Sequence, residues 1–124
     1  MPTFPASERI KSKKLLDKVY QEGELIKHYP YRLKYLITTL DVVGNVQIVV
    51  SVPKRNVKLA VRRNRLKRQI KEAYRLNKKD LLSQFEEKEQ GLALFLIYTG
   101  KEDQNFQLLE KKLKELLKKL QEKL

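Results

Sequence analysis

The chain has 124 residues, and its 28 Lys or Arg against 15 Asp or Glu give a net charge of +13. This length fits a single domain spanning residues 1–124. The chain has no cysteine and one histidine, which excludes a disulfide framework and a thiolate zinc site. No apolar run reaches about 18 residues and no signal-peptide pattern opens the chain, so we expect a cytoplasmic protein with no membrane partner.

The first expected element is a helix over residues 8–21. Ser7 is a candidate N-cap, apolar residues follow at helical spacing, and Gly23 is a stop signal. Leu25 and Ile26 give a weak signal for a short edge strand. The helix is expected to dock on a sheet.

Two strands are expected next. Residues 31–40 alternate between two sets of side chains, which is the period of a strand. Residues 46–52 are rich in β-branched residues and follow a turn at 41–45. This order predicts a hairpin in which the two strands pair with each other.

The most basic segment, residues 54–79, carries twelve Lys or Arg and one acid, Glu72. Leu66, Ile70 and Tyr74 recur at helical spacing, so we predict a helix over 57–77 with Asn56 as its N-cap. The basic side chains then fan over the opposite side. Asn64, Arg68, Lys71 and Arg75 form one row about 16 Å long at 1.5 Å per residue.

A solvated helix face is the ordinary interpretation of such a row. It is weaker here, because solvated helices mix charge signs at i, i+4 spacing and like charges at that spacing repel. The row therefore predicts binding to an external polyanion. Arg63 lies at the edge of the apolar arc, where it must reach outward or line a cleft.

The C-terminal third begins with a short helical continuation over residues 80–90. Residues 92–98 are apolar throughout, which predicts a central strand covered on both faces. A leucine stripe predicts a helix over 104–123, with Asp103 as its cap. We expect this stripe to pack on the sheet rather than in a coiled coil with a partner, so no obligate protein partner is predicted.

Signatures of catalysis are absent from the chain. It has no Gly-x-Ser-x-Gly, no cysteine and no second histidine for a proton relay. Its aspartates fall at expected helix ends or turns, where capping is their usual role. We therefore predict a binding module with no catalytic residue and no metal site.

The basic helix closely resembles the Arg-Asn-Arg motif helix of the bacterial ribonuclease P protein component family. The resemblance lies in residues 60–75 (AVRRNRLKRQIKEAYR) and in the preceding residues 51–55 (SVPKR). Residues 4–14, followed by Val19-Tyr20 and Gly23, are similar to the opening helix of that family. Two departures stand out. Lys58-Leu59 replaces a Gly-Asn that is frequent in the family, which suggests an altered helix start, and Leu16 stands where an aromatic residue is common.

The resemblance implies an α+β fold: a single-domain α/β sandwich with a largely antiparallel sheet of about four strands, three helices and a left-handed βαβ crossover. It implies the non-catalytic protein subunit of an endoribonuclease whose RNA removes the 5′ leader of precursor tRNA, with magnesium held mainly by that RNA. The residues implied to bind the catalytic RNA are Arg63, Asn64, Arg65, Lys67, Arg68, Lys71 and Arg75.

The resemblance also implies a cleft between the first helix and the sheet for the single-stranded leader, where aromatic faces stack on bases. Its implied lining is Leu16, Tyr20, Tyr31, Lys34, Tyr35, Lys54 and Arg55. From the residues alone, core packing is the alternative for the three tyrosines, since alternation does not show which strand face is open.

Two other functions stay open at this point. A ribosomal protein or RNA-assembly factor would carry the same basic helix, and only the Arg63-Asn64-Arg65 order with its flanks favours ribonuclease P. A helix-turn-helix DNA binder needs a helix before the recognition helix, whereas a strand is expected here.

Overall fold

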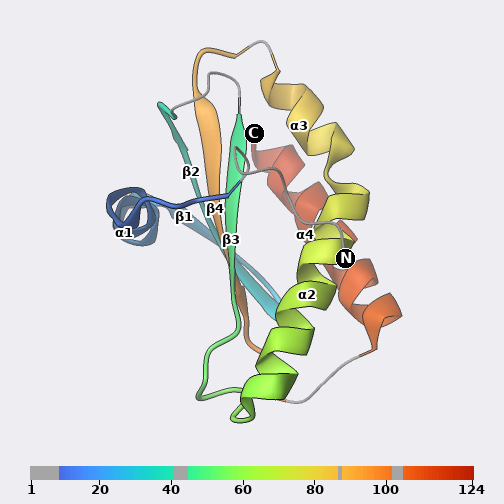
Figure 1. Cartoon of the computed structure of the whole chain (residues 1–124). Helices are drawn as coiled ribbons and strands as arrows, with labels where there is room; N and C mark the ends of the chain where they lie inside the picture. Colours follow the sequence, from blue (N-terminus) through green and yellow to red (C-terminus); the bar gives the residue numbers. More distant parts are fainter. Residues whose placement is uncertain (1–8, 41–44, 87, 102–104) are drawn as a thin grey trace.

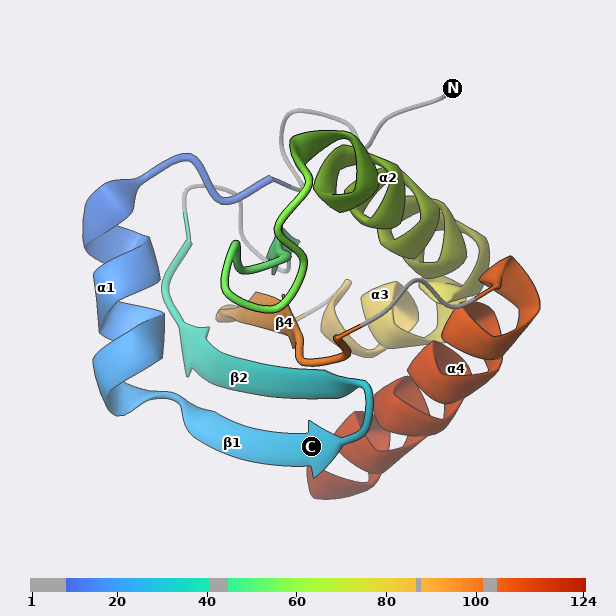
Figure 2. The ribbon, with the colours of Figure 1, turned by 90° about the horizontal axis from the view of Figure 1, so that it is seen from below.

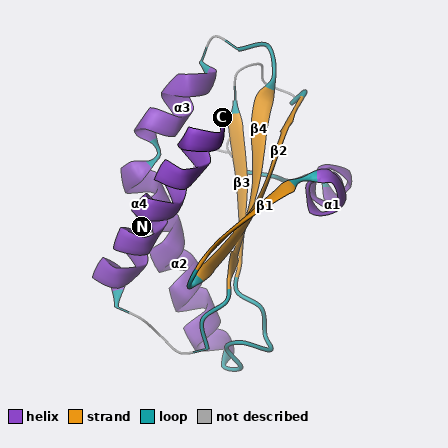
Figure 3. Ribbon diagram, turned by 180° about the vertical axis from the view of Figure 1, so that it is seen from behind, coloured by secondary structure: helices purple, strands orange, loops and turns teal. Residues whose placement is uncertain are grey.

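A computed structural model describes residues 9–40, 45–86, 88–101 and 105–124. The elements in chain order are α1 (Lys13–Glu22), β1 (Glu24–His28), β2 (Tyr31–Thr38), β3 (Val46–Ser51), α2 (Ala60–Asn77), α3 (Lys79–Phe85), β4 (Gly91–Tyr98) and α4 (Phe106–Lys123). The sheet separates α1 on one face from α2, α3 and α4 on the other (Figures 1 and 3). The α+β class is confirmed, but the expected count of three helices is wrong because the short segment after α2 is a helix of its own.

The sheet has four strands in the order β1-β2-β4-β3. β1 pairs with β2 and β2 with β4 in antiparallel fashion, whereas β3 pairs with β4 in parallel, so the sheet is mixed rather than largely antiparallel. The expected hairpin between β2 and β3 is wrong because β4 lies between them. The prediction that β4 is a central strand is confirmed, because it lies between β2 and β3 and its residues are buried or half-buried.

The connection from β3 to β4 crosses the face of the sheet that carries α2 and α3. Figures 1 and 2 together show that β4 lies to the left of β3 when the helix layer faces the viewer and both strands point upward. The crossover is therefore left-handed, as the resemblance implied, against a right-handed preference of about 98%.

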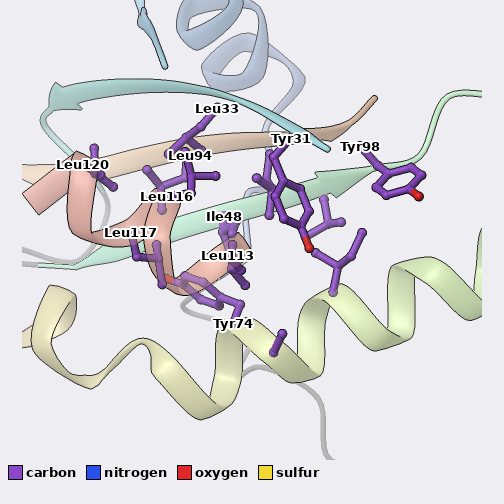
Figure 4. Close-up of a cluster of buried hydrophobic side chains, with 14 of the residues drawn as sticks. Tyr31, Leu33, Ile48, Tyr74, Leu94, Tyr98, Leu113, Leu116, Leu117 and Leu120 are labelled. Carbon is purple, nitrogen blue, oxygen red and sulfur yellow. The ribbon is translucent and has the colours of Figure 1, made fainter. Parts of the chain in front are cut away.

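The leucine stripe of α4 packs into the main core, between α2 and the sheet. Figure 4 shows the α4 side chains beside Leu33 of β2, Ile48 of β3 and Leu94 of β4. The buried members of the stripe are Leu109, Leu113, Leu116, Leu117 and Leu120. The prediction that this stripe packs on the sheet is confirmed. A smaller cluster of Val19, Leu40 and Ala93 lies under α1.

The predicted starts of α1 and α4 are wrong. α1 begins at Lys13, where the Ser12 hydroxyl accepts a hydrogen bond from the Leu15 amide at 3.2 Å. The predicted cap Ser7 lies outside the described residues. α4 begins after Asn105, whose side chain accepts from the Leu108 amide at 2.8 Å. Asp103, its predicted cap, and residues 41–44 of the predicted turn also lie outside the described residues.

The start of α2 is three residues later than predicted, and Asn56 does not cap it. The backbone amides of Asn56 and Val57 both donate to the Pro53 carbonyl, which closes a tight turn before the helix. The Asn56 side chain instead donates to the Tyr98 carbonyl at 3.1 Å, at the end of β4. The N-cap is Leu59, which makes no side-chain capping bond.

Candidate RNA interface

The rotation of α2 about its axis is fixed by one apolar stripe. Leu66, Ile70, Ala73 and Tyr74 are buried in the main core. Because these side chains face inward, the basic residues face outward, as the helical period predicts. The exposed members of the predicted set are Asn64, Arg65, Arg68 and Lys71, and the half-buried members are Arg63, Lys67 and Arg75.

Most cations of this face are not neutralised by the protein. Among the residues that the structure describes, no hydrogen bond or ion pair involves the side chain of Arg65, Lys67, Arg68 or Lys71. Arg75 differs, because its guanidinium forms an ion pair with Glu72. Like charges on one face repel, so the four unneutralised cations favour an external anion as their partner. We name these four residues the α2 row.

Arg63 points in another direction. Its Nη1 donates to the Val57 carbonyl at 3.0 Å and to the Lys58 carbonyl at 2.7 Å. The side chain therefore folds back onto the segment before the helix instead of joining the α2 row.

That segment, residues 53–59, is named the basic turn. Its Lys54 and Arg55 are exposed. It connects the end of β3 to the start of α2, the helix that carries the α2 row (Figures 1 and 2). Leu59, in place of the asparagine frequent in the family, has extended backbone angles (φ −79°, ψ 125°) and is 60% exposed.

The opposite face of the sheet carries a second surface beside α1. Tyr20 is 56% exposed, and its ring centroid lies 6.3 Å from that of Phe95 on β4. The ammonium group of Lys34 on β2 lies 4.0 Å from the Tyr20 ring centroid, which is a cation–π distance. Leu16 is half-buried one helical turn before Tyr20. Aromatic and cationic groups thus meet on this face of the sheet. We name the surface formed by Leu16, Tyr20, Lys34 and Phe95 the α1 surface.

Tyr31 and Tyr35 do not line this surface, and the prediction that placed them there is wrong. They alternate with Lys34 along β2 and so lie on the face covered by α4. Tyr31 is 1% exposed, and its hydroxyl donates to the Leu109 carbonyl at 2.9 Å. Tyr35 donates to a Glu24 carboxylate oxygen at 2.6 Å, and burial together with this bond raises the pKa of its hydroxyl to about 12.

Phe95 is the member of the α1 surface that the sequence did not indicate. It pairs with Lys34 across the antiparallel ladder and therefore shares its face of the sheet. The continuous apolar run of β4 hid the alternation that would have identified it.

Two features are absent from the described part of the chain. No group of three or more His, Cys, Asp or Glu comes together as a metal site there. No helix in that part is long and apolar enough to cross a membrane.

Known proteins share both the sequence and the fold. A model of the family described as Ribonuclease P matches residues 4–121. The Ribonuclease P protein component of Porphyromonas gingivalis W83 is 32% identical over 118 residues, covering 94% of this chain and 86% of that protein. That of Chlorobium phaeobacteroides is 31% identical over 120 residues, covering 89% of this chain and 82% of that protein. This chain belongs to the ribonuclease P protein family.

Solved structures of ribonuclease P proteins have the same fold. The protein from Thermotoga maritima superposes with a TM-score of 0.69 at 24% identity, covering 90% of this chain and 96% of that chain. A Staphylococcus aureus RNase P protein mutant gives a TM-score of 0.67 at 18% identity, covering 92% and 88% respectively. At these identities the two structures support the fold alone.

Proposed function

We propose that this ribonuclease P family protein is the protein subunit of ribonuclease P and binds its catalytic RNA through the α2 row. The observation that carries this proposal concerns the α2 row: its four side chains share the outer side of one helix, and none has a partner among the residues that the structure describes. A row of cations fits a run of phosphates, and contacts of this kind position an RNA without reading its sequence.

Cleavage chemistry is assigned to the RNA. Magnesium bound by the RNA supplies the metal-ion catalysis, and the residues of this chain contribute positive charge. The α2 row is expected to lower the repulsion between RNA phosphates that approach each other in the active fold. Protein cations and magnesium then serve partly the same purpose, so the protein should matter most when magnesium is scarce.

The α1 surface is proposed to hold the single-stranded 5′ leader of precursor tRNA. Tyr20 and Phe95 offer aromatic faces, and stacking on such a face contributes about 1–3 kcal/mol per base. Lys34 places a cation beside the Tyr20 ring, where it can meet a leader phosphate. Lys54 and Arg55 were also expected in this cleft, but they lie on the basic turn before α2, and we assign them to the catalytic RNA together with the α2 row.

A ribosomal protein or RNA-assembly factor would use the same α2 row. The charge of the row therefore does not distinguish such a role from that of a ribonuclease P subunit. The family membership favours ribonuclease P. Reconstitution is the direct test: at limiting magnesium, adding the protein to ribonuclease P RNA should accelerate removal of the 5′ leader from precursor tRNA. Unchanged cleavage across a magnesium titration, despite tight RNA binding, would favour the ribosomal or assembly role.

Replacing Tyr20 with alanine should weaken binding of precursor tRNA to the reconstituted enzyme by about 1–3 kcal/mol, because one stacking face is lost. Binding of mature tRNA, which lacks the leader, should hardly change. Stability should also hardly change, since Tyr20 is 56% exposed.

Titrations of both tRNAs, together with a denaturant melt, check this prediction. Tyr20→Phe is the matched control because it keeps the ring and should retain the affinity for precursor tRNA. If the variant lost affinity equally for precursor and mature tRNA, the proposal that Tyr20 binds the leader would be wrong.

A further inference from the structure

The basic turn is held at three points. The Val57 side chain is 4% exposed and belongs to the main core. The side-chain amide of Asn56 donates to the Tyr98 carbonyl at the end of β4. The third anchor is Arg63 in the first turn of α2, whose side chain donates to the Val57 and Lys58 carbonyls. The turn is thus tied to the core, the sheet and the helix.

Arg63 is the only one of these anchors that also belongs to the basic motif. Both N–H groups of its Nη1 are directed to carbonyl oxygens of the turn, at 3.0 and 2.7 Å. A guanidinium suits this task because its donors are held in a rigid planar fork. The side chain is half-buried against the turn, whereas Arg65 and Arg68 are exposed.

We propose that Arg63 is a positioning residue, which holds the basic turn so that Lys54 and Arg55 meet the RNA backbone in a fixed arrangement beside the α2 row. Arg63 itself does not bind phosphate. This inference rests on the proposed RNA-binding function and assigns one member of the motif to a different task within it.

The physical basis is preorganisation. Lys54 and Arg55 are exposed, and no described residue forms a hydrogen bond or ion pair with either side chain. Their arrangement is therefore set by the backbone of the turn. If the turn moved freely, ordering it would cost conformational entropy on binding, and affinity would fall although no contact was removed.

A double-mutant cycle separates positioning from direct contact. Arg63→Ala should weaken binding to ribonuclease P RNA about tenfold in the otherwise native protein. The same substitution should have little effect in a Lys54→Gln/Arg55→Gln background, because the cations that it positions are already absent. Arg68→Ala is the comparison: Arg68 has no bond to the turn, so its substitution should cost the same in both backgrounds.

Arg63→Lys gives a second readout. Lysine keeps the positive charge, but its ammonium is one bond closer to the backbone than Nη1 and its donors are not held in a plane, so it should not reach both carbonyls of the turn. A positioning role therefore predicts a loss close to that of Arg63→Ala. Filter binding at fixed salt and magnesium measures all variants, and a thermal melt of each shows whether it is folded.

Three results would overturn the proposal. One is an equal loss for Arg63→Ala in both backgrounds, the second is full affinity in Arg63→Lys, and the third is a loss explained by unfolding of the variant. Failure of the native protein to bind the RNA would instead contradict the proposed function.

Discussion

Replacing Arg65 and Arg68 together with alanine is expected to weaken binding to ribonuclease P RNA about a hundredfold. Both side chains are exposed on the outer side of α2, and neither bonds to any other described side chain or backbone group. A hydrogen bond to a charged group contributes roughly 1.5–3 kcal/mol, so two lost phosphate contacts amount to about 3 kcal/mol or more. Cleavage at limiting magnesium should fall as well, and high magnesium should partly restore it.

Filter binding and a magnesium titration of cleavage measure these effects. Lys27→Ala/Lys123→Ala is the matched control, because it removes two exposed cations that lie away from α2. The control should bind nearly as tightly as the native protein, and neither double variant should lose much thermal stability. If the arginine variant unfolds, these arginines are structural and the assignment of the helix face is wrong.

Leu113→Ala is expected to lower the free energy of unfolding by about 2–5 kcal/mol, the usual cost of removing a large aliphatic side chain from a core. Leu113 is 1% exposed and lies in the core between the sheet and α2. Such a loss is a large share of the total stability of a small domain. A urea melt followed by circular dichroism measures it.

Leu108→Ala on the same helix is the control. Leu108 is 38% exposed, so its replacement should lower the free energy of unfolding much less. Equal losses of stability in the two variants would contradict the assignment of Leu113 to the core and Leu108 to the surface.

Local patterns predicted most elements, but they did not predict how the strands pair. The helical period gave α2 and α4, and the apolar run of β4 gave its central place. The local pattern paired β3 with β2 because neighbouring strands in sequence often pair, and nothing local in residues 46–52 shows that β4 will enter between them. Only the family resemblance, with its βαβ crossover, implied that β3 runs parallel to the strand after the basic helix. Helix starts were missed where several polar residues could cap, as with Ser7 and Ser12.

In the candidate site, too, the sequence predicted some features and missed others. The outward position of the four cations of the α2 row follows from one helical period, so the sequence predicted it. The row expected from the spacing was a different set, Asn64, Arg68, Lys71 and Arg75, because the sequence did not show that Arg75 would pair with Glu72. Tyr31 and Tyr35 were misplaced because alternation shows that they share a face and not which face is open. The bonds of Arg63 to the basic turn depend on the path of residues 53–59, for which the sequence gives only a proline and an approximate helix start.

The salt dependence of RNA binding tests the central claim most directly. Neutralising phosphates releases counterions, so log K falls linearly with log salt, by about 0.7–0.9 per phosphate contacted. The α2 row alone then predicts a slope of roughly −3, and Lys54 and Arg55 should make it steeper. The measurement is filter binding to ribonuclease P RNA over a range of potassium concentrations at constant magnesium. A slope near −3 or steeper agrees with binding through these cations, and a slope near zero would contradict it.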